Sequence, residues 1–201
     1  MKKIYLFSIS SGVFLVAFIF IALMFSQADL KAKGSSAPMD SKEIQQMREC
    51  HMKGDIDNTI KKAQAYLKAN PDNVEAMIRL SECYVSQGKL ATAEEWAKKA
   101  LLSSNNKDIW ALRAMAEIYR RQFEESKDVN SKKKYIDLAM STIVKALIIS
   151  PNDVGVNGEA ACIYLSANDK VKAKEAIEFA LAGEPKNEFF LKLKEAIQSM
   201  K

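Results

Sequence analysis

The chain has 201 residues and a formal net charge of +5, and its 30 basic residues include Lys2 and Lys3 at the N-terminus. The remainder carries 28 basic against 25 acidic residues, interleaved along the chain. This near balance excludes the strongly basic surface typical of nucleic-acid-binding proteins, and the length leaves room for one domain of usual size.

The first element in chain order is an apolar segment from Ile4 to Phe25 that contains no charged residue. As a helix its 22 residues would span roughly 33 Å, enough to cross a hydrocarbon core of about 30 Å. We therefore predict a membrane anchor over residues 1–25. The two lysines ahead of it favour a cytoplasmic N-terminus, which places the bulk of the chain outside the cytoplasm, on the periplasmic side of a bacterial inner membrane.

A cleaved signal peptide is the alternative interpretation of the same segment. Ser26 and Ala28 are small residues at the two positions that a signal peptidase reads. Both interpretations export the rest of the chain. Small, polar, Pro and Gly residues then dominate, without apolar periodicity, so residues 26–41 are predicted to be a flexible linker.

A recurrence begins at about residue 42. The spacing from Pro151 to Pro185 equals the spacing from Pro71-Asp72 to Asn105-Asn106. The stretches between these marks align with one another. The matched pairs are Tyr84 with Tyr164, Gly88 with Asn168, Ala93 with Ala173, and Ala100 with Ala180.

This period of about 34 residues, with two helical segments in each unit, resembles the tetratricopeptide repeat. The residues that match the motif of that family are Leu80, Ser81, Tyr84, Gly88, Ala93, Ala100 and Pro185. The tryptophan that opens the first helix of the family motif is missing. The resemblance implies an all-α solenoid over residues 42–201, with about four helix pairs and a C-terminal capping helix.

Local chemistry supports the same helix pairs independently. Gly88 and Asn168 follow first helices, where a left-handed residue is needed and only Gly or Asn adopts it at little cost. Ala93 and Ala100 are small enough for neighbouring helices to approach closely. Asp72-Asn73 is a good N-cap after a proline.

One unit is about eleven residues longer than the others, and the excess lies within Arg120 to Lys134. We expect its first helix to run on and its second to start near Ser131 or Lys132, so that both project from the solenoid. The projecting hairpin is either a tolerated insertion or a partner contact. Phe123, Lys127 and Val129 are the candidate contact residues.

The residues that carry chemistry are sparse. His51 is the single histidine, and Cys50, Cys83 and Cys162 have no metal-ligand spacing, so each cysteine is expected to be a small packing residue. No phosphate loop, nucleophile elbow or histidine-based triad is present. We therefore predict no catalytic residues, no metal, no cofactor and no small-molecule substrate.

Protein binding is then the favoured function. The resemblance implies that first helices line a concave ligand face. The residues it places there are Arg48, His51, Arg79, Glu82, Trp110, Arg113, Glu117, Arg120 and Arg121. An exposed Trp among arginines is typical of recognition surfaces. The alternative is that Trp110 packs against the preceding unit. The Lys-and-Asn clamp with which some family members hold a C-terminal carboxylate is absent.

Two functions remain open. The first is a membrane-tethered scaffold for assembly of an envelope complex of pilus, secretion or export type. The second is a holder of unfolded clients. The layout is similar to that of small periplasmic repeat subunits of cytochrome c maturation, which hold apocytochrome for haem attachment.

Overall fold

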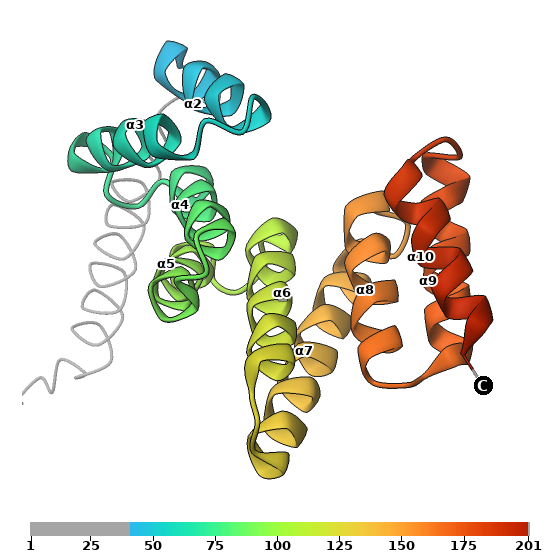
Figure 1. Ribbon diagram of the computed structural model, residues 1–201. Helices are drawn as coiled ribbons and strands as arrows, with labels where there is room; N and C mark the ends of the chain where they lie inside the picture. Colours follow the sequence, from blue (N-terminus) through green and yellow to red (C-terminus); the bar gives the residue numbers. More distant parts are fainter. Residues whose placement is uncertain (1–40, 201) are drawn as a thin grey trace, which may run out of the picture. The chain divides into compact units, whose positions relative to one another are not determined.

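The computed structural model describes residues 41–200 as a succession of helices that pack in pairs (Figure 1). The expected anchor and the expected linker up to residue 40 lie outside the described residues. Within residues 41–200, no helix has the length and hydrophobicity needed to cross a membrane. The helices are α2 (Lys42–Met52), α3 (Ile56–Ala69), α4 (Val74–Ser86), α5 (Leu90–Ser103), α6 (Ile109–Glu125), α7 (Val129–Ile149), α8 (Val154–Ser166), α9 (Lys170–Gly183) and α10 (Glu188–Ser199).

The helix boundaries follow from short polar signals. The side chains of Asn73, Asp153 and Asn187 each cap a helix by accepting a hydrogen bond from the backbone N–H three residues later. Gly88 and Asn168 adopt φ angles of 70° and 59° after α4 and α8. The left-handed positions predicted between the two helices of these pairs are therefore confirmed.

Contacts between helices build the core pair by pair. Each first helix packs on its own second helix, as in α4 with α5, and on the first helix of the next pair, as in α4 with α6. Within the described residues, contacts join only helices that are neighbours in sequence or separated by one helix. Across residues 41–200, four helix pairs followed by the single helix α10 confirm the predicted solenoid.

The third pair is the longest, as the insertion predicts. Helices α6 and α7 have 17 and 21 residues. Helix α7 begins at Val129, so the expected start near Ser131 or Lys132 is wrong by two or three residues. The reason is an earlier cap, because the side chain of Asp128 accepts a hydrogen bond from the Ser131 N–H at 2.7 Å.

Ala93 and Ala173 lie at close helix crossings and are fully buried. The Ser81 hydroxyl of α4 donates to the Ala93 carbonyl oxygen of α5 at 3.0 Å, so these two helices approach closely at Ala93. Replacing either alanine with leucine should therefore lower the free energy of unfolding by about 1–3 kcal/mol. Urea denaturation measures this change.

Lys98→Ala is the matched control on α5. Lys98 is 57% exposed in its side chain and pairs with Glu94 at 2.6 Å. Loss of such an exposed pair should change stability by less than about 0.5 kcal/mol. Equal effects of the alanine and lysine substitutions would contradict the helix register described above.

Candidate functional site

The residues predicted for the concave face lie on the first helices α2, α4 and α6. Their side of these helices, with the adjoining side of α8, is here called the first-helix face. Ion pairs connect successive helices along it. At its N-terminal end Arg48 of α2 binds Glu75 of α4 through two hydrogen bonds, Nε to Oε1 at 2.5 Å and Nη2 to Oε2 at 2.7 Å. Such a two-point contact fixes the orientation of both side chains.

Glu82 is the centre of the next cluster. Its carboxylate accepts hydrogen bonds from Arg79 at 2.7 Å, on the same helix, and from Arg113 of α6 at 2.8 Å. The His51 Nε2 atom of α2 lies 3.4 Å from the same carboxylate. The Glu82 side chain is only 12% exposed, so α2, α4 and α6 meet at one shielded charge.

A third cluster joins α6 to α8. Arg120 donates to Glu159 of α8 at 2.9 Å and to Glu124 of its own helix at 2.7 Å, while Arg121 lies 3.8 Å from Glu117. The Glu159 side chain is 11% exposed. Burial, which outweighs the nearby Arg120, raises the pKa of the Glu159 carboxyl to about 7.

Trp110 lies in the first turn of α6, next to Arg113 of the second cluster. The residue is 44% exposed, and the Arg113 guanidinium lies 5.1 Å from the ring centroid. The edge of the ring rests on α8, because a Cβ added to Gly155 would lie 3.2 Å from Trp110 Cζ3. The ring thus contacts the following helix pair, whereas the alternative expectation named the preceding one.

The cysteines do not supply a nucleophile to this face. Cys83 is fully buried, with its sulfur 3.9 Å from His51 Nδ1, and burial raises its pKa to about 11. Burial likewise raises the pKa of Cys162 to about 12. Both thiols therefore stay protonated at neutral pH. The packing role predicted for Cys83 is confirmed, whereas Cys50 and Cys162 are only half-buried.

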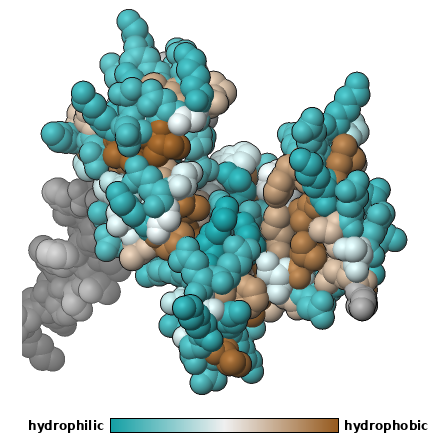
Figure 2. Space-filling view, viewed as in Figure 1, coloured by the Kyte–Doolittle hydropathy of each residue, from teal (hydrophilic) through white to brown (hydrophobic). Residues whose placement is uncertain are grey.

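The structure places the hairpin candidates together at the far end of α6 and α7. Figure 2 shows a hydrophobic spot there, and Val129 is 78% exposed. Phe123 is half-buried beneath Lys132, whose ammonium lies 5.6 Å from the ring centroid, and Lys127 is exposed. Gln122 donates to Glu94 of α5 at 2.8 Å, so the base of the hairpin is tied to the preceding pair.

The sequence analysis did not identify the residues that contact the predicted arginines and Trp110. Glu75, Glu159 and Gly155 were not predicted to belong to the site, although the sequence contains a positional signal for two of them. Glu75, Trp110 and Gly155 each stand two residues after a helix N-cap, and this shared position faces a neighbouring first helix. Counting from the caps could have located Glu75 and Gly155, but not Glu159, which stands six residues after its N-cap Asp153.

Comparisons with known proteins agree with this architecture. Residues 51–116 match the family model described as the tetratricopeptide repeat. No curated protein sequence matches the chain.

Solved structures share the fold at low sequence identity. A thermophilic tetratricopeptide repeat protein from Thermus thermophilus, TTC0263, has 22% identity and a TM-score of 0.72, covering 79% of this chain and 81% of that one. A tetratricopeptide repeat protein from Parabacteroides merdae has 20% identity and a TM-score of 0.53, covering 79% and 59%. The MamA protein has 21% identity and a TM-score of 0.52, covering 77% and 76%. The described residues thus have a tetratricopeptide-type helical solenoid fold.

Proposed function

We propose that this chain is a non-enzymatic adaptor that binds a protein partner on its first-helix face, with Trp110 as the central contact. The solenoid fold is one of protein–protein interaction modules, and the exposed indole gives the proposal its focus. Trp110 is 44% exposed although Arg113 and Gly155 hold its ring in place. A large aromatic surface that is already fixed loses little side-chain entropy when a partner covers it.

The arginines around Trp110 support the proposal in a different way. Arg48, Arg79, Arg113 and Arg120 already form hydrogen bonds with glutamates, so a partner does not need to neutralise them. Their pairing keeps the first helices in fixed register and frames the indole. We infer that these residues orient the face, whereas Trp110 contributes most of the contact energy.

The location that we propose for the adaptor rests on the segment at residues 4–25, which contains no charged residue. We propose that it tethers the adaptor to a membrane, with the solenoid on the periplasmic side, where it helps to assemble an envelope complex of pilus, secretion or export type.

The tether makes a direct prediction. The mature protein should keep Met1 and stay in the membrane fraction after high-salt or alkaline washing. N-terminal sequencing of the fractions measures this. A soluble species beginning at Asp29 would instead identify residues 1–28 as a signal peptide.

Replacing Trp110 with alanine should weaken partner binding by about 30-fold, the effect of removing a contact worth about 2 kcal/mol. The tagged full chain is used to capture partners from detergent-solubilised membranes, and mass spectrometry identifies them. Affinities of the purified partner for the parent and the variant then give the ratio. Thermal melts establish that both proteins are folded.

Val129→Asp is the matched control at the end of the hairpin. It should leave capture unchanged, because the hairpin end lies outside the first-helix face. If Val129→Asp abolishes capture and Trp110→Ala does not, the contact is the hairpin with Phe123, Lys127 and Val129. If the captured material consists only of short unfolded segments in transient complexes, the chain is a client holder, as for apocytochrome, and not a scaffold.

A further inference from the structure

His51 links helix α2 to helix α4 at the N-terminal end of the described residues. Its two ring nitrogens face different partners: Nε2 lies 3.4 Å from Oε2 of Glu82, and Nδ1 lies 3.9 Å from the sulfur of Cys83. The Cys83 thiol is fully buried and stays protonated, because burial raises its pKa to about 11. This geometry fits a neutral imidazole that carries its proton on Nε2, toward the carboxylate, and accepts the thiol proton on Nδ1.

A second proton on the ring meets unfavourable surroundings. It would reside on Nδ1 and point at the Cys83 sulfur, which is a weak acceptor and is shielded from water. The Glu82 carboxylate already accepts hydrogen bonds from Arg79 and Arg113, so an imidazolium would be the third cation at one carboxylate. Burial lowers the pKa of His51, and the two arginines act in the same direction, whereas Glu82 raises it.

The other polar groups around the ring do not accommodate the second proton. On α3, Thr59 lies beside the Cys83 thiol and carries no charge, while the Asp55 side chain caps its own helix. On α2 itself, Arg48 stands one turn before His51 and is paired with a glutamate of α4. Among the described residues, Nδ1 therefore has only the sulfur as a neighbour to which it could donate.

Helix α2 can leave α4 without disturbing the rest of the solenoid. Among the described residues it contacts only α3 and α4, and it approaches α4 at only a few positions. The end units of a solenoid open more easily than the inner ones, because they have a neighbour on one side only. The His51 side chain is 26% exposed, so a small movement of α2 brings the ring into water.

We propose that α2 is a pH-sensitive end of the solenoid, docked on α4 while His51 is neutral and released when the ring gains a second proton. The stability that docking provides is present at neutral pH and is lost as the pH falls below about 6.5, the ordinary pKa of histidine. Release also removes Arg48 from the first-helix face, which becomes shorter by one helix in mildly acidic surroundings. This device rests on the fold and does not depend on the function proposed above.

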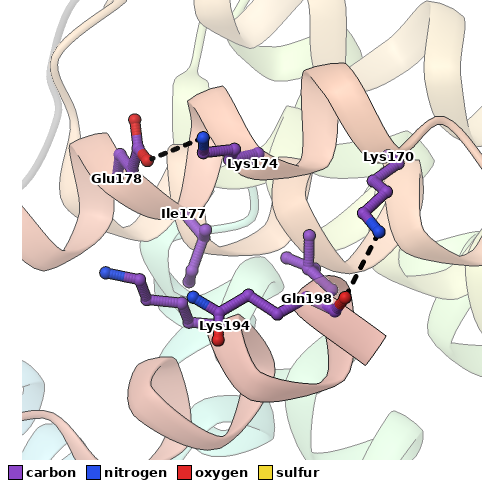
Figure 3. Close-up of a pocket in the computed structure, with 7 residues that line it drawn as sticks. Lys170, Lys174, Ile177, Glu178, Lys194 and Gln198 are labelled. Carbon is purple, nitrogen blue, oxygen red and sulfur yellow. Dashed lines mark hydrogen bonds and ion pairs between the residues drawn. The ribbon is translucent and has the colours of Figure 1, made fainter. Parts of the chain in front are cut away.

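The opposite end of the solenoid provides an internal control. Figure 3 shows that Lys170 of α9 reaches the end of α10, where its ammonium donates to the backbone carbonyl oxygens of Gln198 and Met200. Lys174 lies 3.9 Å from Glu178 at the rim of the cavity between these helices. Backbone carbonyls do not titrate, and lysine keeps its proton between pH 7 and pH 5. The attachment of α10 should therefore not weaken in this range.

The test uses the full chain in detergent micelles, without a histidine tag, so that His51 is its single histidine. NMR spectra of the ring protons and nitrogens give its tautomer and its titration midpoint. Hydrogen exchange, corrected for the intrinsic exchange rate at each pH, measures how often α2 and α10 open between pH 7 and pH 5. His51→Gln is the test variant, because glutamine does not titrate and its side-chain N–H can still face Glu82.

The parent should have the Nε2–H tautomer at pH 7 and a titration midpoint below the ordinary value of about 6.5. Opening of α2 should increase severalfold between pH 7 and pH 5, and by at most about tenfold for each pH unit, which is the limit for uptake of one proton. Helix α10 should not lose protection. In His51→Gln, the opening of α2 should not depend on pH in this range. If glutamine unfolds the chain, His51→Asn replaces it.

The proposal is wrong if α2 of the parent opens equally often at pH 7 and pH 5. It is also wrong if α2 opens less often at pH 5, because Glu82 would then hold the charged ring in place. Joint opening of α2 and α10 would indicate unfolding of the whole chain by acid. An unchanged pH dependence in His51→Gln would assign the effect to another group.

Discussion

Between about pH 4.5 and pH 7, the free energy of unfolding of the parent should decrease by about 3 kcal/mol, and Glu159→Gln should abolish this decrease. The carboxyl has a pKa of about 7 in the folded chain against 4.5 in the unfolded chain, because burial opposes its charge. Between these values the folded state binds more protons than the unfolded state, so stability decreases as pH rises. The size follows from about 1.4 kcal/mol for each pKa unit.

Urea denaturation at several pH values measures the difference between parent and variant. His51 has its pKa lowered by burial and acts in the opposite direction, because its stabilising contribution is lost as pH falls. Both proteins contain His51, so its effect cancels in the difference. Glu124→Gln is the matched control, since Glu124 binds the same Arg120 at 2.7 Å with its side chain 43% exposed. Parallel pH profiles of parent and Glu159→Gln would refute the burial of this charge.

Gly158→Leu should lower the free energy of unfolding by about 3 kcal/mol, at the upper end of overpacking costs. Gly158 lies on α8 where α10 crosses it, and even a single added Cβ would lie 2.5 Å from Phe190 Cε1 and 2.8 Å from its Cζ. Phe190 is only 8% exposed, so its ring is packed against its neighbours. We therefore expect α10 to detach before the rest of the solenoid unfolds.

Thermal melts and hydrogen exchange along α10 measure this outcome. Phe190→Ala should itself destabilise the chain by about 3–5 kcal/mol, through the cavity it leaves. The double variant Gly158→Leu, Phe190→Ala should be more stable than the sum of the two changes, because leucine then fills that cavity. Strict additivity would mean that the two residues do not share one contact.

The helix pairs were predictable because their signals are local. A cap such as Asn73 or Asp153 and a left-handed residue such as Gly88 or Asn168 each act within one turn, and they repeat at a fixed period. The greater length of α6 and α7 was predictable because their unit has about eleven residues more than the others. The predicted start of α7 was two or three residues too late because Asp128, which is the N-cap of this helix, was assigned to the loop between α6 and α7.

The candidate site was only partly predictable, for a different physical reason. The positions of Arg113 and Trp110 follow from the helix register, but their partners depend on how neighbouring pairs cross. Glu159 is a charged residue on a helix of small and apolar residues, and sequence alone does not indicate that Arg120 reaches it. In the sequence, Gly155 and Gly158 are only residues of low helix propensity. The packing of the neighbouring helices shows that a side chain at either position would collide with an aromatic ring.

The restriction of helix contacts to near neighbours in sequence has a kinetic consequence. No contact in residues 41–200 requires the two ends of the chain to meet, so closing each contact orders only a short loop, and such topologies fold fast. A first helix can dock on the pair already formed as soon as it leaves the ribosome. The solenoid can therefore be completed from its N-terminal end while synthesis of the rest is still in progress, with little apolar surface exposed at any moment.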